Sequence, residues 1–235
     1  MQQYFVKKQV NDTFSFYDQD IVHIKKVMRM KLQDEIVCVF NNKRYLCKLI
    51  KLEPLLAEID KELVSNYCSN VSITLFQAMI KPKHFNDSVI KATEMNVETT
   101  YGVYFNRSQA NLKINKDRTL KIIKESSEQS NRNNLMNFDI IKNLEKMLSY
   151  CEKLDLLIVA YENEDNLNLE HVLKMMDNKS KITVGIVIGP EGGFERDEIN
   201  ALKKQGAKIV KLTNTILRSE TAAMYCIANI TNKFN

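Results

Sequence analysis

A predicted strand that runs through a glycine-rich loop into a helix is the feature that most constrains this chain. The strand is an apolar run, Ile182–Ile188, and the loop that follows it is Gly189-Pro190-Glu191-Gly192-Gly193. A helical pattern over residues 195–205 comes next, with acids in its first turn, lysines near its end and Gly206 after it. Three of the six glycines in the 235-residue chain lie in this loop. The pattern predicts a strand–loop–helix unit whose backbone amides can bind a small ligand.

The composition of the loop limits the kind of ligand. A carboxylate at Glu191 would repel a phosphate chain, and the G-x-x-x-x-G-K-[ST] spacing of a phosphate-binding loop is absent. A neutral or cationic small molecule, bound through backbone amides and carbonyls, fits this loop better.

From Val71 onward, short apolar runs alternate with stretches of helical periodicity. Strands are predicted at residues 71–76, 101–105, 155–161, 182–188 and 207–212. Helices are predicted at residues 83–95, 117–129, 139–154, 169–176, 195–205 and 219–230. Such alternation is typical of an α/β domain with a mainly parallel sheet that helices cover. We therefore expect one α/β domain over residues 71–235.

The first 70 residues have a different pattern. Aromatic and branched runs at residues 4–6, 13–17, 36–40 and 45–50 predict short strands, and residues 20–30 are compatible with a short helix between them. The last two strands are separated by Asn41-Asn42-Lys43-Arg44, and Asn tolerates the positive φ of a hairpin turn. The pattern predicts a small β-barrel domain over residues 1–70.

Composition excludes several classes of protein. The chain is 44% hydrophobic and 27% charged, as ordinary soluble proteins are, and no apolar run approaches the roughly 20 residues that span a bilayer. The amino terminus lacks the charged start and apolar core of a signal peptide. Five cysteines without a C-x-x-C pair are typical of reduced, mostly buried thiols in a cytosolic protein. The three histidines are far apart, so we expect no metal site. Together, these features predict a cytoplasmic protein without membrane contact.

The net charge of +5 is distributed unevenly. Residues 76–150 carry +4, whereas residues 151–235, which contain the glycine loop, carry −1. Between residues 107 and 132, seven basic residues stand against three acidic ones. This strip is compatible with a solvated helix face and with a surface that faces nucleic-acid phosphates, and charge alone does not decide between them.

A second segment of interest joins a predicted strand to the last helix. It places the apolar residues Ile216 and Leu217 beside Arg218 and Glu220. In an α/β sheet this segment, the glycine loop and Ala160-Tyr161-Glu162 would all lie at the carboxyl edge, where ligands bind. One interpretation is that the apolar side chains enclose an adenine while Arg218 and Glu220 face a reacting group. The other is that the apolar pair belongs to the core and Glu220 interacts with the helix dipole.

Two motifs taken together resemble one enzyme family. Gly189-Pro190-Glu191-Gly192-Gly193-Phe194, followed by Ile216-Leu217-Arg218-Ser219-Glu220-Thr221-Ala222, is similar to the carboxyl-terminal motifs of the small-subunit (16S) rRNA uridine-N3 methyltransferases, a family of the SPOUT, or trefoil-knot, class. Further matches follow in the expected order over nearly the whole chain: His23-Ile24 with Val27 and Arg29, Lys91 to Met95, Arg107-Ser108, and Glu125 with Gln129-Ser130 and Arg132.

The resemblance implies an amino-terminal PUA-like β-barrel and a carboxyl-terminal α/β domain with a trefoil knot, a rare exception to the usual topology rules. It implies S-adenosylmethionine (SAM) as the cofactor, held in the knot by three loops. The residues that it assigns to the cofactor site are Ala160, Tyr161, Ile188, Gly189, Glu191, Gly192, Gly193, Leu212, Ile216, Leu217 and Arg218. The implied partners are small-subunit rRNA, naked or in the assembled small ribosomal subunit, and a second copy of the chain in a homodimer.

The implied reaction suggests roles for individual side chains. Methylation of uridine N3 requires loss of the N3 proton, because the neutral imide nitrogen is a poor nucleophile. A guanidinium keeps its charge and suits the stabilisation of the resulting anion, so Arg218 is the first catalytic candidate. Glu220 is the expected carboxylate partner, and Glu191 is the alternative, unless it belongs to a structural network. The residues expected to contact RNA phosphates are Lys25, Lys26, Arg29, Arg107 and Arg132.

The chain departs from the family pattern at four positions. Thr213 and Thr215 stand where the family usually has glycine and arginine, and Gln33 and Asn96 replace glycines. These departures concern individual contacts rather than the class of enzyme. Two alternatives remain open: a knotted 2′-O-ribose RNA methyltransferase, and a non-catalytic RNA-binding factor of ribosome assembly.

Overall fold

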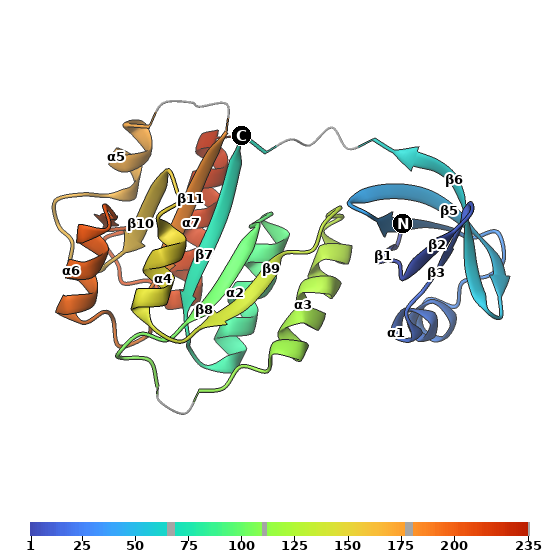
Figure 1. Cartoon of the computed structure of the whole chain (residues 1–235), viewed down its shortest axis with the longest axis horizontal. Coiled ribbons are helices and arrows are strands. Elements are labelled where there is room, and N and C mark those ends of the chain that lie inside the picture. The colour runs from blue at the N-terminus through green and yellow to red at the C-terminus, as the bar shows by residue number, and fades with distance from the viewer. Residues whose placement is uncertain (65–68, 110–111, 177–180, 235) are drawn as a thin grey trace. The chain divides into compact units, whose positions relative to one another are not determined.

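The computed structural model describes residues 1–64, 69–109, 112–176 and 181–234 (Figure 1). Contacts between residues divide the chain into two compact units. Residues 1–68 and 124–135 form the amino-terminal unit, and residues 69–123 and 136–235 form the carboxyl-terminal unit. The predicted domain boundary near residue 70 places residues 124–135 in the carboxyl-terminal domain, whereas their contacts place them in the amino-terminal unit. Sequence patterns did not indicate this, because the segment is far from residues 1–70 in the sequence.

The amino-terminal unit is built on one six-stranded sheet, in which β1 and β4 are parallel and the other neighbours are antiparallel. In sheet order the strands are β1 (Gln3–Phe5), β4 (Glu35–Phe40), β5 (Lys43–Leu52), β6 (Leu55–Leu63), β3 (Thr13–Ser15) and β2 (Lys8–Val10). A short α-helix, α1 (Asp18–Val22), continues as a π-helix, η1 (His23–Val27). The sequence predicted a small β-barrel, and the structure confirms it as a half-barrel formed by this one six-stranded sheet.

The tight turn between β4 and β5 follows from two consecutive asparagines. Phe40 pairs with Lys43, so Asn41 and Asn42 make the turn, with φ of 49° and 60°. Asn adopts this left-handed backbone more readily than most residues with a side chain. The predicted hairpin is confirmed, with a loop two residues shorter than expected.

Two positions at which the chain replaces family glycines keep a left-handed backbone. Gln33 has φ of 72° and Asn96 has φ of 60°. Asn tolerates this conformation because its short amide bonds locally, whereas Gln gains no such compensation. The turn at Gln33 is therefore a strained position of the amino-terminal unit.

The carboxyl-terminal unit contains an all-parallel six-stranded sheet. In sheet order the strands are β12 (Lys208–Val210), β10 (Leu156–Ala160), β11 (Ile182–Ile188), β7 (Val71–Ala78), β8 (Thr99–Val103) and β9 (Asn137–Ile141). The central strands β7 and β11 are buried along most of their length, which explains their near-continuous apolar runs.

Helices cover both faces of this sheet. They are α2 (Pro82–Glu94), α4 (Leu144–Cys151), α5 (Leu169–Lys174), α6 (Arg196–Lys204) and α7 (Ser219–Phe234). The helix α3 (Lys116–Gln129) begins in this unit, and its residues from 124 onward belong to the amino-terminal unit. The helices α2 and α7 contact each other behind the sheet, and α4 lies in front of it (Figure 1). The predicted α/β domain with a parallel sheet is confirmed, and the trefoil knot stays a prediction.

One predicted helix, at residues 139–154, is wrong in its first part. Phe138 and Ile141 are buried while Asp139 is exposed, and this stretch pairs with β8 as strand β9. The helix α4 begins only after Asn143, whose side chain accepts the amide of Lys146 as an N-cap. The apolar spacing across the strand and the helix happens to fit one helical face, so periodicity did not reveal the break.

The described residues also bear on metals, membranes and thiols. They contain no group of three or more His, Cys, Asp or Glu side chains that could hold a metal ion, and no helix long and apolar enough to cross a membrane.

The described cysteines, Cys38, Cys47, Cys151 and Cys226, are buried free thiols, and Cys68 lies outside the described residues. Burial raises the pKa of both Cys151 and Cys226 to about 12, so these two thiols stay protonated near neutral pH.

Candidate functional site

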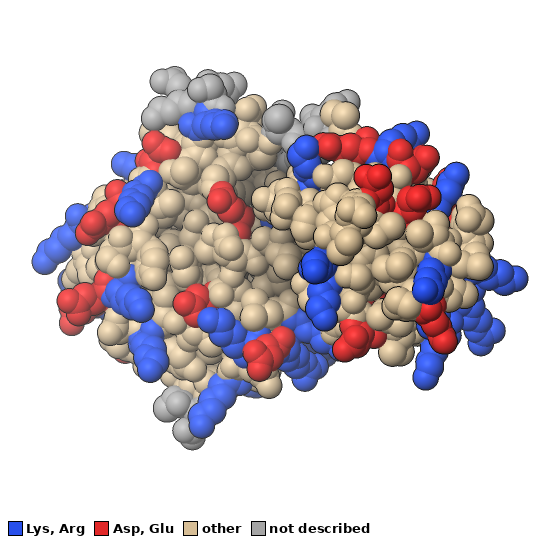
Figure 2. All heavy atoms as spheres, turned by 45° about the vertical axis from the view of Figure 1, so that its right-hand side comes forward, with Lys and Arg blue, Asp and Glu red and all other residues tan. Residues whose placement is uncertain are grey.

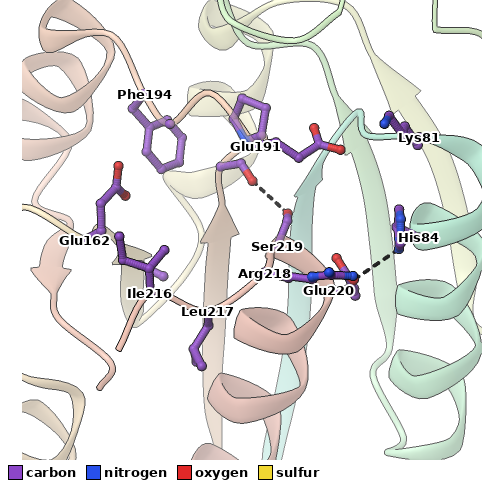
Figure 3. Close-up of a pocket in the computed structure, with 14 residues that line it drawn as sticks. Lys81, His84, Glu162, Glu191, Phe194, Ile216, Leu217, Arg218, Ser219 and Glu220 are labelled. Atoms are coloured by element: carbon purple, nitrogen blue, oxygen red, sulfur yellow. Dashed lines mark hydrogen bonds and ion pairs between the residues drawn. The ribbon is translucent and has the colours of Figure 1, made fainter. Parts of the chain in front are cut away.

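A pocket of about 470 Å³ opens at the carboxyl ends of β10 and β11 (Figure 3). Ala160 pairs with Ile188 in the parallel register, so the segments after these two strands leave the sheet at the same level. The start of α2 and the segment that leads into α7 complete the lining. The lining residues are Lys81, His84, Ala160, Glu162, Gly189, Pro190, Glu191, Gly193, Phe194, Ile216, Leu217, Arg218, Ser219 and Glu220.

The loop after β11 packs so closely that two of its positions require glycine. A Cβ at Gly189 would lie 2.9 Å from the ring of Phe194, which is itself buried. Gly193 has φ of 69°, and a Cβ there would lie 2.8 Å from Glu162 Oε1. The amide of Gly193 donates to Pro190 O at 2.9 Å and closes the turn. Close packing against Phe194 therefore explains Gly189, and the left-handed backbone explains Gly193.

The segment before α7 forms another wall of the pocket. Ile216 is 84% exposed, so the interpretation that it belongs to the core is wrong, whereas Leu217 packs against the core. Thr213 Oγ1 donates to Thr215 O at 2.6 Å, so this hydroxyl bonds within its own loop. The wall thus presents an exposed apolar side chain to whatever the pocket binds.

The same segment also lines a second pocket of about 150 Å³, which shares Ala160, Glu162, Ile216 and Leu217 with the first. Tyr161 and Leu212 line this second pocket only. The structure therefore brings nine of the eleven predicted cofactor residues to two adjoining pockets. The other two line neither pocket: Ile188 is buried within β11 at 2% exposure, and Gly192 is contacted by Arg107.

Arg218 and Glu220 lie at the start of α7. Arg218 O accepts the amide of Ala222 at 2.8 Å, and the exposed Arg218 side chain extends toward the α2 side of the pocket (Figure 3). Oε1 of Glu220 lies 3.1 Å from Nδ1 of His84, with the two side chains 14% and 30% exposed. Both predicted catalytic side chains therefore line the pocket, and His84 fixes the position of one of them.

Sequence reasoning missed two charged or titratable residues of the pocket, Lys81 and His84. Both come from the start of α2, and Pro82 at the first position of that helix is the local signal for its beginning. With them, the pocket holds cationic or titratable groups on its α2 side and carboxylates at Glu162, Glu191 and Glu220. Such a mixed lining suits a ligand that carries both signs of charge.

Comparison with known proteins identifies the family. A model of the RNA methyltransferase domain matches residues 68–231, and a model of the RNA methyltransferase PUA domain matches residues 16–62. A ribosomal RNA small subunit methyltransferase E from Buchnera aphidicola subsp. Schizaphis graminum is 31% identical over 238 residues, which cover 96% of this chain and 93% of that one. This chain belongs to the ribosomal RNA small subunit methyltransferase E family.

Other relatives of the methyltransferase E family agree over the full length. The protein of that name from Bacillus subtilis is 28% identical, over 98% of this chain and 96% of its own. Among solved structures, a hypothetical protein matches with a TM-score of 0.86 and 25% identity over 100% and 99% of the two chains. The methyltransferase E of Neisseria gonorrhoeae, bound to SAM, has the same fold, with a TM-score of 0.83 and 22% identity over 100% and 98%.

In this member of the methyltransferase E family, the basic residues predicted to contact RNA have different environments. Lys26 and Arg29 are exposed on or beside η1, whereas Lys25 forms an ion pair with Glu53 at 3.1 Å. Arg107 Nε donates to Glu195 Oε1 at 2.8 Å, and its Nη1 donates to Gly192 O at 3.1 Å. Arg107 thus braces the glycine loop of the pocket.

The prediction that Arg132 contacts RNA phosphates does not agree with its burial. It is only 6% exposed, its carbonyl accepts Gln3 Nε2 at 2.6 Å, and its Nη2 donates to Asn134 Oδ1 at 3.4 Å. Arg132 belongs to the segment 124–135 of the amino-terminal unit, and its guanidinium is too buried there to meet a phosphate in solvent.

The basic strip at residues 107–132 is not a uniform cationic surface. Lys116 pairs with Asp139, and Lys124 with Asp20 and Glu128. Figure 2 shows Lys and Arg interspersed with Asp and Glu over the face that it displays. Several positive charges of the strip are therefore neutralised by ion pairs within the protein. The strip attracts phosphate less strongly than its number of basic residues indicates.

Proposed function

We propose that this protein transfers the methyl group of SAM to N3 of a specific uridine in small-subunit rRNA. The observation that carries the proposal is the pocket at the carboxyl edge of the sheet, where the glycine loop meets Arg218 and Glu220. Membership of the methyltransferase E family supports the same reaction.

The pocket is suited to SAM in size and lining. Its volume of about 470 Å³ lies within the range of small-molecule sites, which is roughly 300–1,000 Å³. The exposed Ile216 offers an apolar surface to an adenine, and the tight glycine loop offers backbone groups. Carboxylates at Glu162 and Glu191 favour the cationic parts of the cofactor. A structure of a Legionella pneumophila protein with the same fold contains bound SAM, in support of this assignment.

Bound SAM supplies an electrophilic methyl group, and the protein has to present uridine N3 as a nucleophile. Arg218 stabilises the negative charge that spreads onto O2 and O4 when the N3 proton leaves, since a guanidinium keeps its charge. Glu220 accepts that proton or orients the base, and His84 holds its carboxylate in place. Positioning of the two reactants supplies a large part of the acceleration.

Partners and location follow from this proposal. The exposed Lys26 and Arg29 would contact RNA phosphates, and a homodimer would present RNA-binding surfaces from both copies. Small-subunit rRNA as the substrate implies a cytoplasmic protein. The domain boundary near residue 70 and the trefoil knot belong to the same proposal.

The proposal predicts a specific nucleoside in cellular RNA. Deletion of this gene should remove 3-methyluridine from small-subunit rRNA, and the wild-type gene should restore it, as nucleoside mass spectrometry would measure. A loss of 2′-O-methylribose instead would favour the ribose methyltransferase. If calorimetry detected no SAM binding at millimolar concentration, both methyltransferase hypotheses would be excluded, and a non-catalytic factor of ribosome assembly would be the remaining alternative.

The glycine loop gives a prediction for cofactor affinity. Gly189→Ala should weaken SAM binding about tenfold or more, because overpacking against a buried ring costs about 1–3 kcal/mol and the loop must move to relieve it. Isothermal calorimetry would measure the change. Gly206→Ala is the matched control: its φ is also positive, at 86°, but no atom lies within 4 Å of the added Cβ. Equal losses of affinity in both variants would contradict the packing argument.

A further inference from the structure

Three buried polar side chains form a hydrogen-bond relay that ends at the glycine loop. The Ser88 hydroxyl donates to Gln77 Oε1 at 2.9 Å, and Gln77 Nε2 donates to Ser219 Oγ at 2.8 Å. The Ser219 hydroxyl in turn donates to Gly189 O at 2.7 Å, the contact drawn as a dashed line in Figure 3. The relay therefore joins α2, β7 and the start of α7 to the loop after β11.

The relay has a fixed direction. Ser219 has a single proton, and because its oxygen already accepts from the Gln77 amide, that proton points to the Gly189 carbonyl. The Gly189 carbonyl can only accept, so Ser219 must donate to it and must itself accept from the NH₂ group of Gln77; the Gln77 carbonyl then accepts from Ser88. Ser88, Gln77 and Ser219 are 1%, 0% and 8% exposed, so water does not compete for these bonds.

Gln77 is a polar exception within an apolar environment. Its neighbours on β7, Leu75, Phe76 and Ala78, are all fully buried apolar residues. An apolar side chain of similar volume would fill this position without the cost of burying an amide. The strand therefore carries a buried amide whose hydrogen bonds to Ser88 and Ser219 connect α2 to the start of α7.

The last hydrogen bond of the relay joins two different walls of the pocket. Gly189 begins the glycine loop, and Ser219 stands between Arg218 and Glu220 in the sequence. A hydrogen bond between these two positions sets how far the catalytic candidates lie from the loop. Loss of the relay would leave both walls in place but free to move relative to each other.

We propose that Gln77, fixed by Ser88 and acting through Ser219, is a positioning residue for methyl transfer. It holds Arg218 and Glu220 in register with the loop that binds the cofactor. The inference rests on the proposed function. It predicts that weakening the relay lowers the rate of the bound complex more than it lowers cofactor affinity.

The first test is Gln77→Met, which keeps the side-chain volume and removes both hydrogen bonds of the relay, together with the longer bond from Gln77 Nε2 to Ala78 O at 3.4 Å. We expect kcat with saturating SAM and rRNA to fall about 10- to 100-fold while the Kd for SAM rises less than about threefold, since misplacement by an ångström or less costs rate before it costs binding. Thr100→Val is the matched control, because Thr100 is also fully buried in the same sheet, its hydroxyl donates to Met136 Sδ at 3.2 Å, and neither residue lines the two pockets. This control should keep its kcat.

A second variant, Gln77→Glu, tests the direction of the relay. Burial raises the pKa of a carboxyl group, and a protonated Glu can donate to Ser219 while it accepts from Ser88 as Gln does. Its kcat relative to wild type should therefore rise as the pH falls from about 8 to about 6. A ratio that stays flat or falls over this interval would contradict the assigned direction.

Folded fractions measured by circular dichroism allow kcat to be expressed per folded enzyme. A Gln77→Met enzyme that keeps kcat within twofold of wild type and loses only thermal stability would overturn the inference. Ser88→Ala, a smaller change at the far end of the relay, should lower kcat severalfold if Gln77→Met does not fold. A wild type that neither binds SAM nor methylates rRNA would overturn the proposed function itself, a result distinct from an active Gln77→Met.

Discussion

Replacement of Arg218 by alanine should nearly abolish methylation while SAM affinity stays within a few fold of wild type. Removal of one group that stabilises developing negative charge typically costs about 10²- to 10³-fold in kcat. Arg218 is exposed at the mouth of the pocket, and its side chain extends toward Glu220 and His84 rather than being used in the core (Figure 3). The measurement is kcat for methyl incorporation into rRNA, with SAM affinity determined by calorimetry.

Two further variants make this result specific. Arg218→Lys keeps the charge but loses the planar guanidinium, so it should recover only part of the activity. Arg196→Ala, at an exposed arginine that begins α6 in the same unit, should leave kcat unchanged. Near wild-type activity of Arg218→Ala would remove Arg218 from the catalytic step.

The second large effect concerns stability and lies in the amino-terminal unit. Lys124 Nζ lies 2.7 Å from Asp20 Oδ1 and 2.6 Å from Glu128 Oε1, and the three side chains are 13%, 7% and 11% exposed. Glu128 also accepts the amide of Phe5 at 3.0 Å. Lys124 is therefore the cation that compensates two nearly buried carboxylates.

Lys124→Met should destabilise the protein by about 3–5 kcal/mol, because the two carboxylates remain buried without their partner. Chemical denaturation followed by circular dichroism would measure the free energy of unfolding. Lys116→Met is the control on the same helix, since its pair with Asp139 is about half exposed and such pairs contribute roughly 0–1 kcal/mol. Similar losses of unfolding free energy in both variants would contradict the argument that burial makes the Lys124 cluster important for stability.

The cluster also predicts how this loss depends on pH. Burial raises the pKa of Glu128, although its hydrogen bond and attraction to Lys124 oppose the rise. A carboxyl whose pKa is higher in the folded state than in the unfolded state favours folding as pH falls and loses that contribution as pH rises through the folded pKa. Without Lys124 the pKa of Glu128 should rise further, so the deficit of Lys124→Met should shrink from pH 7 toward pH 5. A constant deficit would contradict this assignment.

Much of the architecture could be predicted from local patterns. The parallel sheet follows from apolar strands alternating with helices, and the Asn41-Asn42 hairpin follows from the conformational tolerance of asparagine. The strand β9 could not be predicted in this way. Its apolar residues continue the spacing of α4, and only pairing with β8 decides between strand and helix.

The site could be predicted where the motifs are contiguous. The glycine loop and the segment from Ile216 to Glu220 are recognisable as residues in a row, and the structure brings both to one pocket. The departures at Thr213 and Thr215 turn out to bond within their own loop. The roles of Arg107 and Arg132 could not be predicted, since their partners Glu195 and Gln3 are distant in the sequence.

By itself, the sequence determined the class of fold, the family and the two loops that form the site, because each depends on neighbouring residues in the chain. Only the tertiary structure decided that His84 holds Glu220 and that Ser219, which accepts from Gln77, joins the start of α7 to the glycine loop. It alone placed Lys124 between two carboxylates. Hydrogen bonds and ion pairs act over about 3 Å, and local patterns do not report which distant side chains the fold brings within that reach.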